Sequence, residues 1–158
     1  MKAVGPLKEE CTHCELWQEI IRWIGTPFRY GGRTPGRGAD CSTFPLLVFE
    51  RIGRIKPGWW RTLYDLERIR QWRRGEVDLE WFKNKLREIG KIVEKADRCG
   101  DVEIVFNPAT GRFHTRICLY KWEVVEAVPD IGVTLGGWEE RNDAIVLRIL
   151  EGGCERWL

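Results

Sequence analysis

The hydrophobic residues near the start of the chain recur at helical spacing. Four apolar side chains share the positions that one buried helix face requires, namely Leu16, Ile20, Ile21 and Ile24. Thr12 followed by Glu15 matches a capping box, and Gly25 ends the run. The pattern therefore predicts a helix over about residues 13–24.

A second helical pattern follows a loop that is rich in glycine and proline. The loop covers residues 25–38 and has the composition of irregular surface structure. Apolar residues then recur at helical spacing over residues 42–52, and Gly53 ends this pattern. Pro45 lies near the start of the predicted helix, where proline is tolerated. Cys41 consequently lies at the junction between a loop and a helix N-terminus.

The rest of the chain divides into a charged helical segment and a β-rich segment. Residues 54–98 are helical in pattern, with breaks at 56–58 and Gly75, so we expect two or more helices there. After Gly100, short runs rich in β-branched and aromatic residues predict strands at 102–106, 113–120, 123–128 and 144–150. Helices followed by antiparallel strands indicate an α+β fold with a helical insertion at about 54–98.

Size and charge narrow the class of protein. With 158 residues, 43% of them hydrophobic, the chain can bury one core and is short for two, so we predict a single domain over residues 1–158. There are 26 Lys and Arg residues against 24 Asp and Glu residues, a balance that creates no strong field for a polyanion. We therefore expect no nucleic-acid partner.

The sequence predicts neither a secretory signal nor a membrane anchor. Its first residues lack the apolar stretch of about 7–15 residues that a signal peptide needs, and no stretch is long enough to cross a bilayer. We expect the protein to be cytoplasmic when it is synthesised, with no membrane partner. If it acts outside the cell, lysis or incorporation into a virion would have to carry it there.

The cysteines of the chain leave more than one interpretation open. In a reducing compartment we expect mostly free thiols. Cys11 and Cys14 have the spacing of half a zinc site. Four ligands can be counted only by adding distant cysteines, which are Cys99, Cys118 and Cys154. Because a second closely spaced pair is missing, we predict no metal and no other cofactor, and a zinc-stabilised binding module remains an alternative.

Cys41 is the cysteine best placed for chemistry. The unpaired N–H groups and the dipole of a helix N-terminus lower the pKa of a thiol, and only the thiolate is a good nucleophile. Backbone N–H groups at the same junction could also stabilise the oxyanion of a tetrahedral intermediate. One local structure can therefore supply both the nucleophile and part of its electrostatic support.

A thiolate needs a proton partner, and the chain contains two histidines, His13 and His114. His13 falls in the first turn of the first predicted helix, where a solvated side chain is the simpler interpretation. His114 opens a predicted strand, which holds a side chain rigidly enough to meet another part of the fold. Spacing alone favours a Cys41–His114 pair no more than a buried cysteine and an unrelated strand histidine.

A resemblance to a known family favours the pair. Four motifs carry it, and in order they are Gly25-Thr-Pro-Phe-Arg-Tyr-Gly-Gly32, Asp40-Cys-Ser-Thr-Phe44, Gly100-Asp-Val102 and His114-Thr-Arg-Ile-Cys-Leu-Tyr120. In order and spacing these motifs, across about residues 15–128, resemble the NlpC family of papain-like cell-wall cysteine peptidases, in particular the forms found in phage tail modules.

The resemblance implies a papain-like α+β fold in which N-terminal helices pack on a C-terminal antiparallel sheet. It also implies a cysteine peptidase that hydrolyses an amide bond of peptidoglycan stem peptides, of the γ-D-glutamyl to diamino acid type. Cys41 would be the nucleophile and His114 the base. In this family the third residue precedes an alanine on the next strand, a position that Glu126 occupies before Ala127. Neighbouring antiparallel strands can place Glu126 and His114 on one face.

The same resemblance places five residues at the substrate cleft, and two of them depart from the family pattern. These five are Phe28, Tyr30, Asp40, Ser42 and Thr43. Phe28 replaces a tyrosine whose hydroxyl lies near the reacting carbonyl, and Tyr30 is a candidate to compensate. Thr43 replaces a glycine and is expected to narrow the pocket. We expect Asp40 to cap the following helix or to tie down the glycine loop.

These departures keep a second function open. A phage tail structural or adaptor protein could retain the fold as a plug, with Phe28 and Thr43 as signs of a degraded site. In that case phage tail proteins would be the partners, whereas the enzyme would bind the stem peptide. In either function we expect the helical insertion to cover the cleft or contact a neighbouring subunit, with Trp59 and Trp60 as its contact residues.

Overall fold

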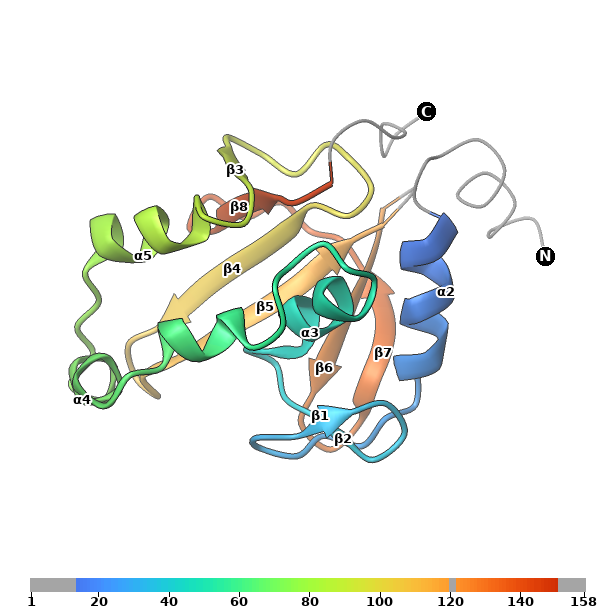
Figure 1. Cartoon of the computed structure of the whole chain (residues 1–158), viewed down its shortest axis with the longest axis horizontal. Coiled ribbons are helices and arrows are strands. Elements are labelled where there is room, and N and C mark those ends of the chain that lie inside the picture. Colours follow the sequence, from blue (N-terminus) through green and yellow to red (C-terminus); the bar gives the residue numbers. More distant parts are fainter. Residues whose placement is uncertain (1–13, 120–121, 151–158) are drawn as a thin grey trace.

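A computed structural model describes residues 14–119 and 122–150 of the chain, and it shows helices packed against one antiparallel sheet (Figure 1). The helical elements are α2 (Cys14–Trp23), α3 (Phe44–Arg51), the 3-10 helix η1 (Trp59–Leu63), α4 (Leu66–Arg73) and α5 (Leu79–Leu86). The strands are β1 (Arg33–Thr34), β2 (Gly38–Ala39), β3 (Lys91–Val93), β4 (Val102–Asn107), β5 (Arg112–Cys118), β6 (Glu123–Val128), β7 (Gly132–Gly137) and β8 (Ile145–Arg148).

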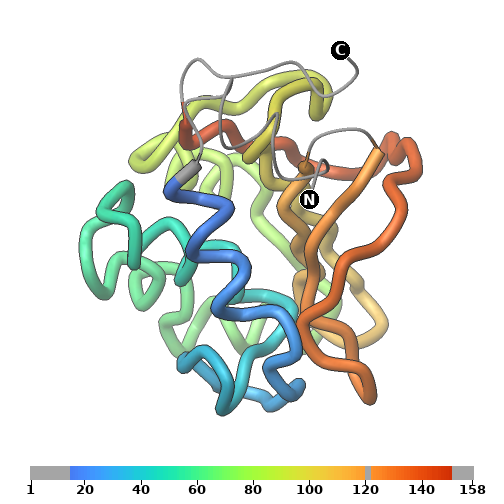
Figure 2. Tube along the Cα trace, turned by 90° about the vertical axis from the view of Figure 1, so that its right-hand side faces the viewer, coloured from blue at the N-terminus to red at the C-terminus, as the bar shows by residue number. Residues whose placement is uncertain are grey.

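The main sheet has six strands in the order β3-β8-β4-β5-β6-β7, and every neighbouring pair is antiparallel. Figure 2 shows the helical segments on one side of this sheet. The arrangement confirms the predicted α+β fold with helices before the sheet. None of the helices within the described ranges is both long and apolar enough to cross a membrane.

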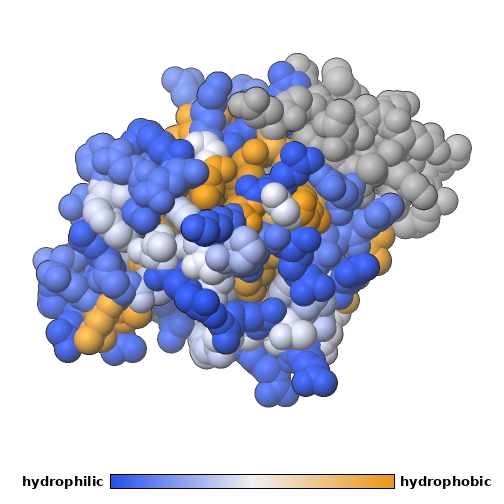
Figure 3. All heavy atoms as spheres, viewed as in Figure 1, coloured by the Kyte–Doolittle hydropathy of each residue, from blue (hydrophilic) through white to orange (hydrophobic). Residues whose placement is uncertain are grey.

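The core lies between the helices and one face of the sheet. Leu16, Ile20 and Trp23 of α2 are fully buried there, and the Trp23 ring meets Phe44 of α3 edge to face with centroids 5.5 Å apart. From the sheet, β5 contributes alternate residues such as Phe113 and Ile117, as the two-residue period of a strand requires. The outer surface in Figure 3 is mostly hydrophilic, with hydrophobic residues gathered near its middle.

The first predicted helix is confirmed as α2, but its buried face differs from the prediction. Ile21 and Ile24 are 51% and 40% exposed, whereas Trp23 is completely buried. Trp23 is held in place because its Nε1 donates a hydrogen bond of 2.9 Å to Glu19, whose carboxylate is also buried. The large indole ring therefore turns the helix so that the two isoleucines face outward. Thr12 of the predicted capping box lies outside the described residues.

The predicted helical insertion ends earlier than expected. Its α-helices stop at Leu86, and Lys91–Val93 form strand β3, which pairs with β8 at the edge of the sheet. Gly90 allows this pairing, since a Cβ atom there would lie 2.6 Å from the backbone oxygen of Arg148. The charged composition of the segment concealed a strand of only three residues.

Strand β7 was not predicted because half of its residues are glycine, which lacks the side chain on which a β-strand pattern depends. Gly132, Gly136 and Gly137 have no side chain to show alternation. Gly132 adopts a φ of +95°, and a Cβ atom there would lie 2.3 Å from the Thr26 backbone oxygen. That close approach lets the Val133 N–H donate a 2.9 Å hydrogen bond to Thr26. The loop after α2 is thus fastened to the outermost strand.

Candidate active site

Cys41 lies in a gap that opens between β5 and β6. Strand β4 pairs with β5 as far as Arg112, whereas the pairing of β6 with β5 stops at the Arg116–Glu126 pair. Beyond that point the backbone oxygen of Cys41 takes the place of β6, because it accepts a 3.0 Å hydrogen bond from the Thr115 N–H. The Thr115 hydroxyl donates to the same oxygen. The predicted loop-to-helix junction is therefore fastened directly to the strand that carries His114.

The divergence of the two strands brings three side chains of the predicted site together. The cross-strand pairing of Arg116 with Glu126 makes His114 the diagonal neighbour of Glu126 on the same face of the sheet. His114 Nε2 lies 2.6 Å from Glu126 Oε1. Cys41 also lies near the His114 ring, because it contributes to the shifted pKa of that imidazole. The free Cys41 thiol lies 3.5 Å from the Phe113 backbone oxygen.

The two contacts of His114 favour its charged form. Hydrogen bonding to Cys41, and secondly to Glu126, raises the pKa of His114 to about 9, although partial burial acts in the opposite direction. In turn, the hydrogen bond from His114 lowers the pKa of Glu126, and the nearby Arg116 and Arg141 act in the same direction. Both neighbours therefore favour the imidazolium form of His114, which can stabilise negative charge on the Cys41 sulfur.

Replacing Glu126 by glutamine is expected to lower the pKa of His114 by about 1 to 2 units, because the variant lacks the carboxylate charge that favours the imidazolium. In the wild type the imidazolium is fully present below its usual pKa of 6.5 and is lost as the pH rises through about 9. Titration of the histidine ring protons by NMR measures the change. His13 is the chain's other histidine and serves as the internal control. An unchanged His114 midpoint would show that Glu126 does not control the charge of the imidazole.

Asp40 makes one of the two contacts that the sequence suggested: it ties down the glycine loop, whereas α3 has Thr43 as its N-cap and no side-chain cap hydrogen bond. The Oδ1 of Asp40 accepts hydrogen bonds from the backbone N–H groups of Ser42, at 3.2 Å, and Thr43, at 2.9 Å. Its Oδ2 accepts a 2.9 Å bond from the N–H of Gly31 in the glycine loop. Asp40 is 7% exposed. The carboxylate thus holds the turn that carries Cys41 against the glycine loop.

This arrangement narrows the choice of an oxyanion donor. The N–H groups of Ser42 and Thr43 are occupied by Asp40, and the N–H of Phe44 bonds to the Asp40 backbone oxygen at 3.2 Å. Within residues 14–119 and 122–150, the backbone N–H of Cys41 itself donates no hydrogen bond. Of the N–H groups expected at this junction, that of Cys41 is the one available to a developing oxyanion.

The remaining predicted cleft residues lie around the same turn. Phe28 pairs with Ala39 in a parallel bridge, and its ring meets Tyr30 edge to face at 5.1 Å. Tyr30 is 64% exposed, and the Arg112 guanidinium lies 4.1 Å from the centre of its ring. Thr43 is buried, and its hydroxyl donates a 2.8 Å bond to Asp40.

A tyrosine that the sequence did not single out lies beside Ser42, the residue after Cys41. Tyr64, which follows η1 in the helical insertion, shares a side-chain hydrogen bond with Ser42. The Ser42 hydroxyl is also 3.2 Å from Asp40 Oδ1, to which it donates a hydrogen bond. Burial raises the pKa of Tyr64, which keeps its phenol protonated. Ser42 therefore links Tyr64 of the insertion to Asp40. The feature of the sequence that pointed to this link was the position of Ser42 next to Cys41.

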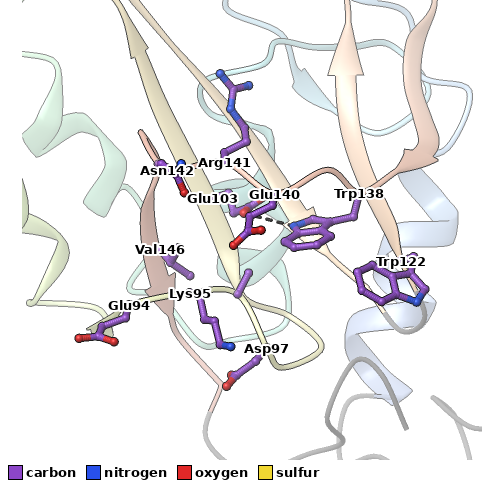
Figure 4. Close-up of a pocket in the computed structure, with 12 residues that line it drawn as sticks. Glu94, Lys95, Asp97, Glu103, Trp122, Trp138, Glu140, Arg141, Asn142 and Val146 are labelled. Carbon is purple, nitrogen blue, oxygen red and sulfur yellow. Dashed lines mark hydrogen bonds between the residues drawn. The ribbon is translucent and has the colours of Figure 1, made fainter.

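Of two cavities in the structure, one lies away from Cys41, His114 and Glu126, and the other is lined by sequence neighbours of Cys41 and His114. A cavity of about 590 Å³ lies beyond Glu103, between β8 and the segment after β7 (Figure 4). Trp122 and Trp138 stand at one side of it, with ring centroids 5.4 Å apart, but Cys41, His114 and Glu126 do not line it. A smaller cavity of about 200 Å³ is lined by Ser42 and Phe113, the sequence neighbours of Cys41 and His114.

The alternative of a zinc site rests largely on residues that lie outside the description. Cys11 and Cys154 are not among the described residues, and nothing is described of the Cys14 side chain. In the described part of the chain, no group of three or more His, Cys, Asp and Glu side chains is arranged to hold a metal ion. The reactive groups that the structure describes at this site are therefore the side chains of Cys41, His114 and Glu126.

Comparison with known proteins identifies the fold. No protein-family model and no curated protein matches the sequence. Among solved structures, the NlpC/p60 domain of the peptidoglycan hydrolase SagA superposes with a TM-score of 0.58 at 19% identity, covering 87% of this chain and 98% of that domain. A protein of the NLP/P60 family from Staphylococcus aureus, described as similar to lipoprotein, gives 0.53 at 18% identity over 96% of this chain and 43% of that protein.

These similarities confirm the predicted papain-like fold, since both structures are NlpC/p60 domains or contain one. The chain spans less than half of the staphylococcal protein. Neither description mentions a phage tail, so the association with phage tails stays a prediction. At this level of identity the comparison establishes the fold, and the chemistry must be argued from the site.

Proposed function

We propose that this chain, which has the NlpC/p60 fold, is a cysteine peptidase that hydrolyses an amide bond in peptidoglycan stem peptides. The observation that carries the proposal is that His114 bonds to Glu126 and lies near Cys41, which stands in the turn before α3. A related fold occurs in a protein described as a peptidoglycan hydrolase. We further propose the γ-D-glutamyl to diamino acid bond as the bond cleaved.

The geometry assigns a step to each of the three residues. The Cys41 sulfur attacks the carbonyl carbon, and the resulting oxyanion accepts a hydrogen bond from the Cys41 N–H. The His114 imidazolium gives its proton to the leaving amine, which breaks the amide bond and leaves a thioester on Cys41. Neutral His114 then takes a proton from water as the water attacks the thioester, which releases the acid and the thiolate. Glu126 keeps the imidazole oriented throughout.

The neighbouring residues position this machinery. Asp40 holds the turn before α3, so that the sulfur of Cys41 and its N–H keep a fixed relation. Phe28 and Tyr30 form a wall of the proposed cleft on the side of the glycine loop. Ser42 links Asp40 to the insertion through Tyr64. The Thr43 hydroxyl serves the same turn, because it bonds to Asp40.

Incubation with defined muropeptides is expected to yield two products whose masses place the break at the γ-D-glutamyl amide and show the gain of one water. Mass spectrometry of the reaction with the full chain measures this directly. A peptide in which the glutamyl residue is linked through its α-carboxyl group is the matched control and is expected to stay intact. Cleavage at another amide would disprove the proposed bond while leaving the peptidase proposal in place.

The reactivity of Cys41 separates an enzyme from a structural adaptor. A catalytic thiol is expected to react with a mild alkylating agent at neutral pH at least tenfold faster than an ordinary exposed cysteine, because it is held as a thiolate. Peptide mapping after short labelling compares Cys41 with Cys11 and Cys154. Equal labelling rates, together with intact muropeptides, would favour the adaptor.

A further inference from the structure

The larger cavity, of about 590 Å³, lies on the face of the sheet that points away from the helices (Figure 4). Glu103, which lines it, alternates along β4 with the core residues Val102 and Ile104, so its side chain points to the opposite face. The volume falls within the roughly 300–1,000 Å³ of sites that bind small molecules. The cavity is therefore large enough for a ligand, and it lies outside the proposed cleft.

Two tryptophans form one wall of this cavity, where β6 and β7 come together. The Trp138 N–H donates a 2.7 Å hydrogen bond to the Trp122 backbone oxygen, and the two ring centroids are 5.4 Å apart with the planes tilted by 44°. Trp122 has a φ of +64°, a conformation that bulky residues rarely adopt. It is also 54% exposed. A strained backbone thus holds a large aromatic ring at the edge of the cavity, where a ligand can reach it.

The floor of the cavity is fixed by the buried ion pair of Glu103 and Arg116. Trp138 Nε1 donates a 3.3 Å hydrogen bond to Glu103, the dashed line in Figure 4. Glu103 is 3% exposed and accepts a 2.6 Å bond from Arg116. The same guanidinium donates to the Glu139 backbone oxygen at 2.8 Å, which fastens the segment that carries Glu140. The Trp138 ring and the segment after β7 are therefore held in place before any ligand binds.

Another side of the cavity is closed by the loop that follows β3. Lys95 and Asp97 of this loop line the cavity (Figure 4). The Asp97 carboxylate pairs with Arg148 of β8 at 2.5 Å, and the Asp97 N–H donates a 3.1 Å hydrogen bond to Asp101. Because this loop is tied to the sheet at two points, the cavity is a built feature of the fold.

The charges that line the cavity are of both signs. Three of them are already paired, namely Glu103, Asp97 and Arg141. The others form no ion pair within residues 14–119 and 122–150, and these are Glu94, Lys95 and Glu140. A charged ligand of either sign would therefore meet a like charge on one side, which disfavours its binding. A neutral ligand can use the same groups as hydrogen-bond donors and acceptors.

This combination of groups suits a sugar. One face of a pyranose ring is made of C–H groups that can pack on an indole, while its hydroxyl groups both donate and accept hydrogen bonds. We infer that the cavity binds a neutral saccharide, with a sugar ring packed on Trp122 and hydroxyl groups bonded to Glu140 and Lys95. Such a site would bind its ligand whether or not Cys41 cleaves an amide bond.

The test is a titration of the full chain with cellobiose and, separately, with N,N′-diacetylchitobiose, followed by NMR of the indole N–H groups. The signals of Trp122 and Trp138, assigned by substitution, are expected to shift with at least one disaccharide and to saturate with a Kd of about 1 mM or less. In Trp122→Ala the affinity should fall at least about tenfold, and in Glu140→Ala about threefold. Trp60→Ala is the matched control, because it also lacks one indole but Trp60 does not line this cavity.

Three outcomes would overturn the saccharide site. One is the absence of a saturable shift with either disaccharide, and another is unchanged affinity in both Trp122→Ala and Glu140→Ala chains that keep the melting temperature of the wild type. The third is tighter binding of tetramethylammonium, acetate or trialanine than of the disaccharides, which would assign the cavity to a different class of ligand. Each leaves the peptidase proposal untouched, because Cys41, His114 and Glu126 do not line this cavity.

Discussion

Replacing Cys41 by alanine is expected to abolish cleavage of the stem peptide, with kcat/KM lower by a factor on the order of 10⁴ or more. The effect is this large because the sulfur forms the bond to the acyl group, so no other side chain can substitute for it. Glu126 and His114 remain in the variant, but they would act on a site without a nucleophile. Product formation measured by liquid chromatography with excess enzyme detects any residual rate.

Two controls show that the loss is chemical. The Cys41→Ala chain should keep the melting temperature of the wild type, because the backbone oxygen of Cys41, and not its sulfur, accepts the bonds from Thr115. The His114→Ala variant should lose activity on the same scale while Cys41 is still labelled, though more slowly, by an alkylating agent. Cleavage by the Cys41→Ala protein at a rate near that of the wild type would remove Cys41 from the mechanism.

Helices α2 and α3 could be predicted from the sequence because their apolar residues recur at helical spacing and a glycine ends each pattern. Strands β4, β5 and β6 could be predicted because β-branched and aromatic residues are frequent in them. The failures have a physical origin as well. In β7 the glycines leave too few side chains to show alternation, and Lys91–Val93 form a strand only because β8 lies beside them. The rotation of α2 depended on the bond from Trp23 to Glu19, which no local pattern reports.

The candidate site shows the same division between local and long-range information. The position of Cys41 just before a helix, and the motif that contains His114, can be seen in short stretches of sequence. The available N–H of Cys41 could not be predicted, because it depends on Asp40 occupying the two N–H groups that follow. Tyr64 was also missed, since it belongs to an insertion whose composition suggests only solvated helices.

The face of the sheet that carries His114 and Glu126 also contains a buried ion pair. Replacing one member of this pair is expected to have a large effect on stability. Arg116 pairs across the strands with both Glu126 and Glu103. Its Nε donates a 2.6 Å hydrogen bond to Glu103, which is 3% exposed, and its Nη2 donates to the Glu139 backbone oxygen at 2.8 Å. The guanidinium therefore neutralises a buried carboxylate and fastens the segment after β7.

Replacing Arg116 by leucine is expected to lower the free energy of unfolding by about 3 to 5 kcal/mol, because Glu103 would stay buried without its cation. Urea unfolding followed by circular dichroism measures this. The Glu103→Leu/Arg116→Leu double variant should recover most of the loss, since a pair of apolar side chains leaves no buried charge and costs the bond to Glu139 and the 3.3 Å bond from Trp138 Nε1 to Glu103. If the double variant is as unstable as the single one, the cost comes from packing, and the ion pair does not explain the stability of this face.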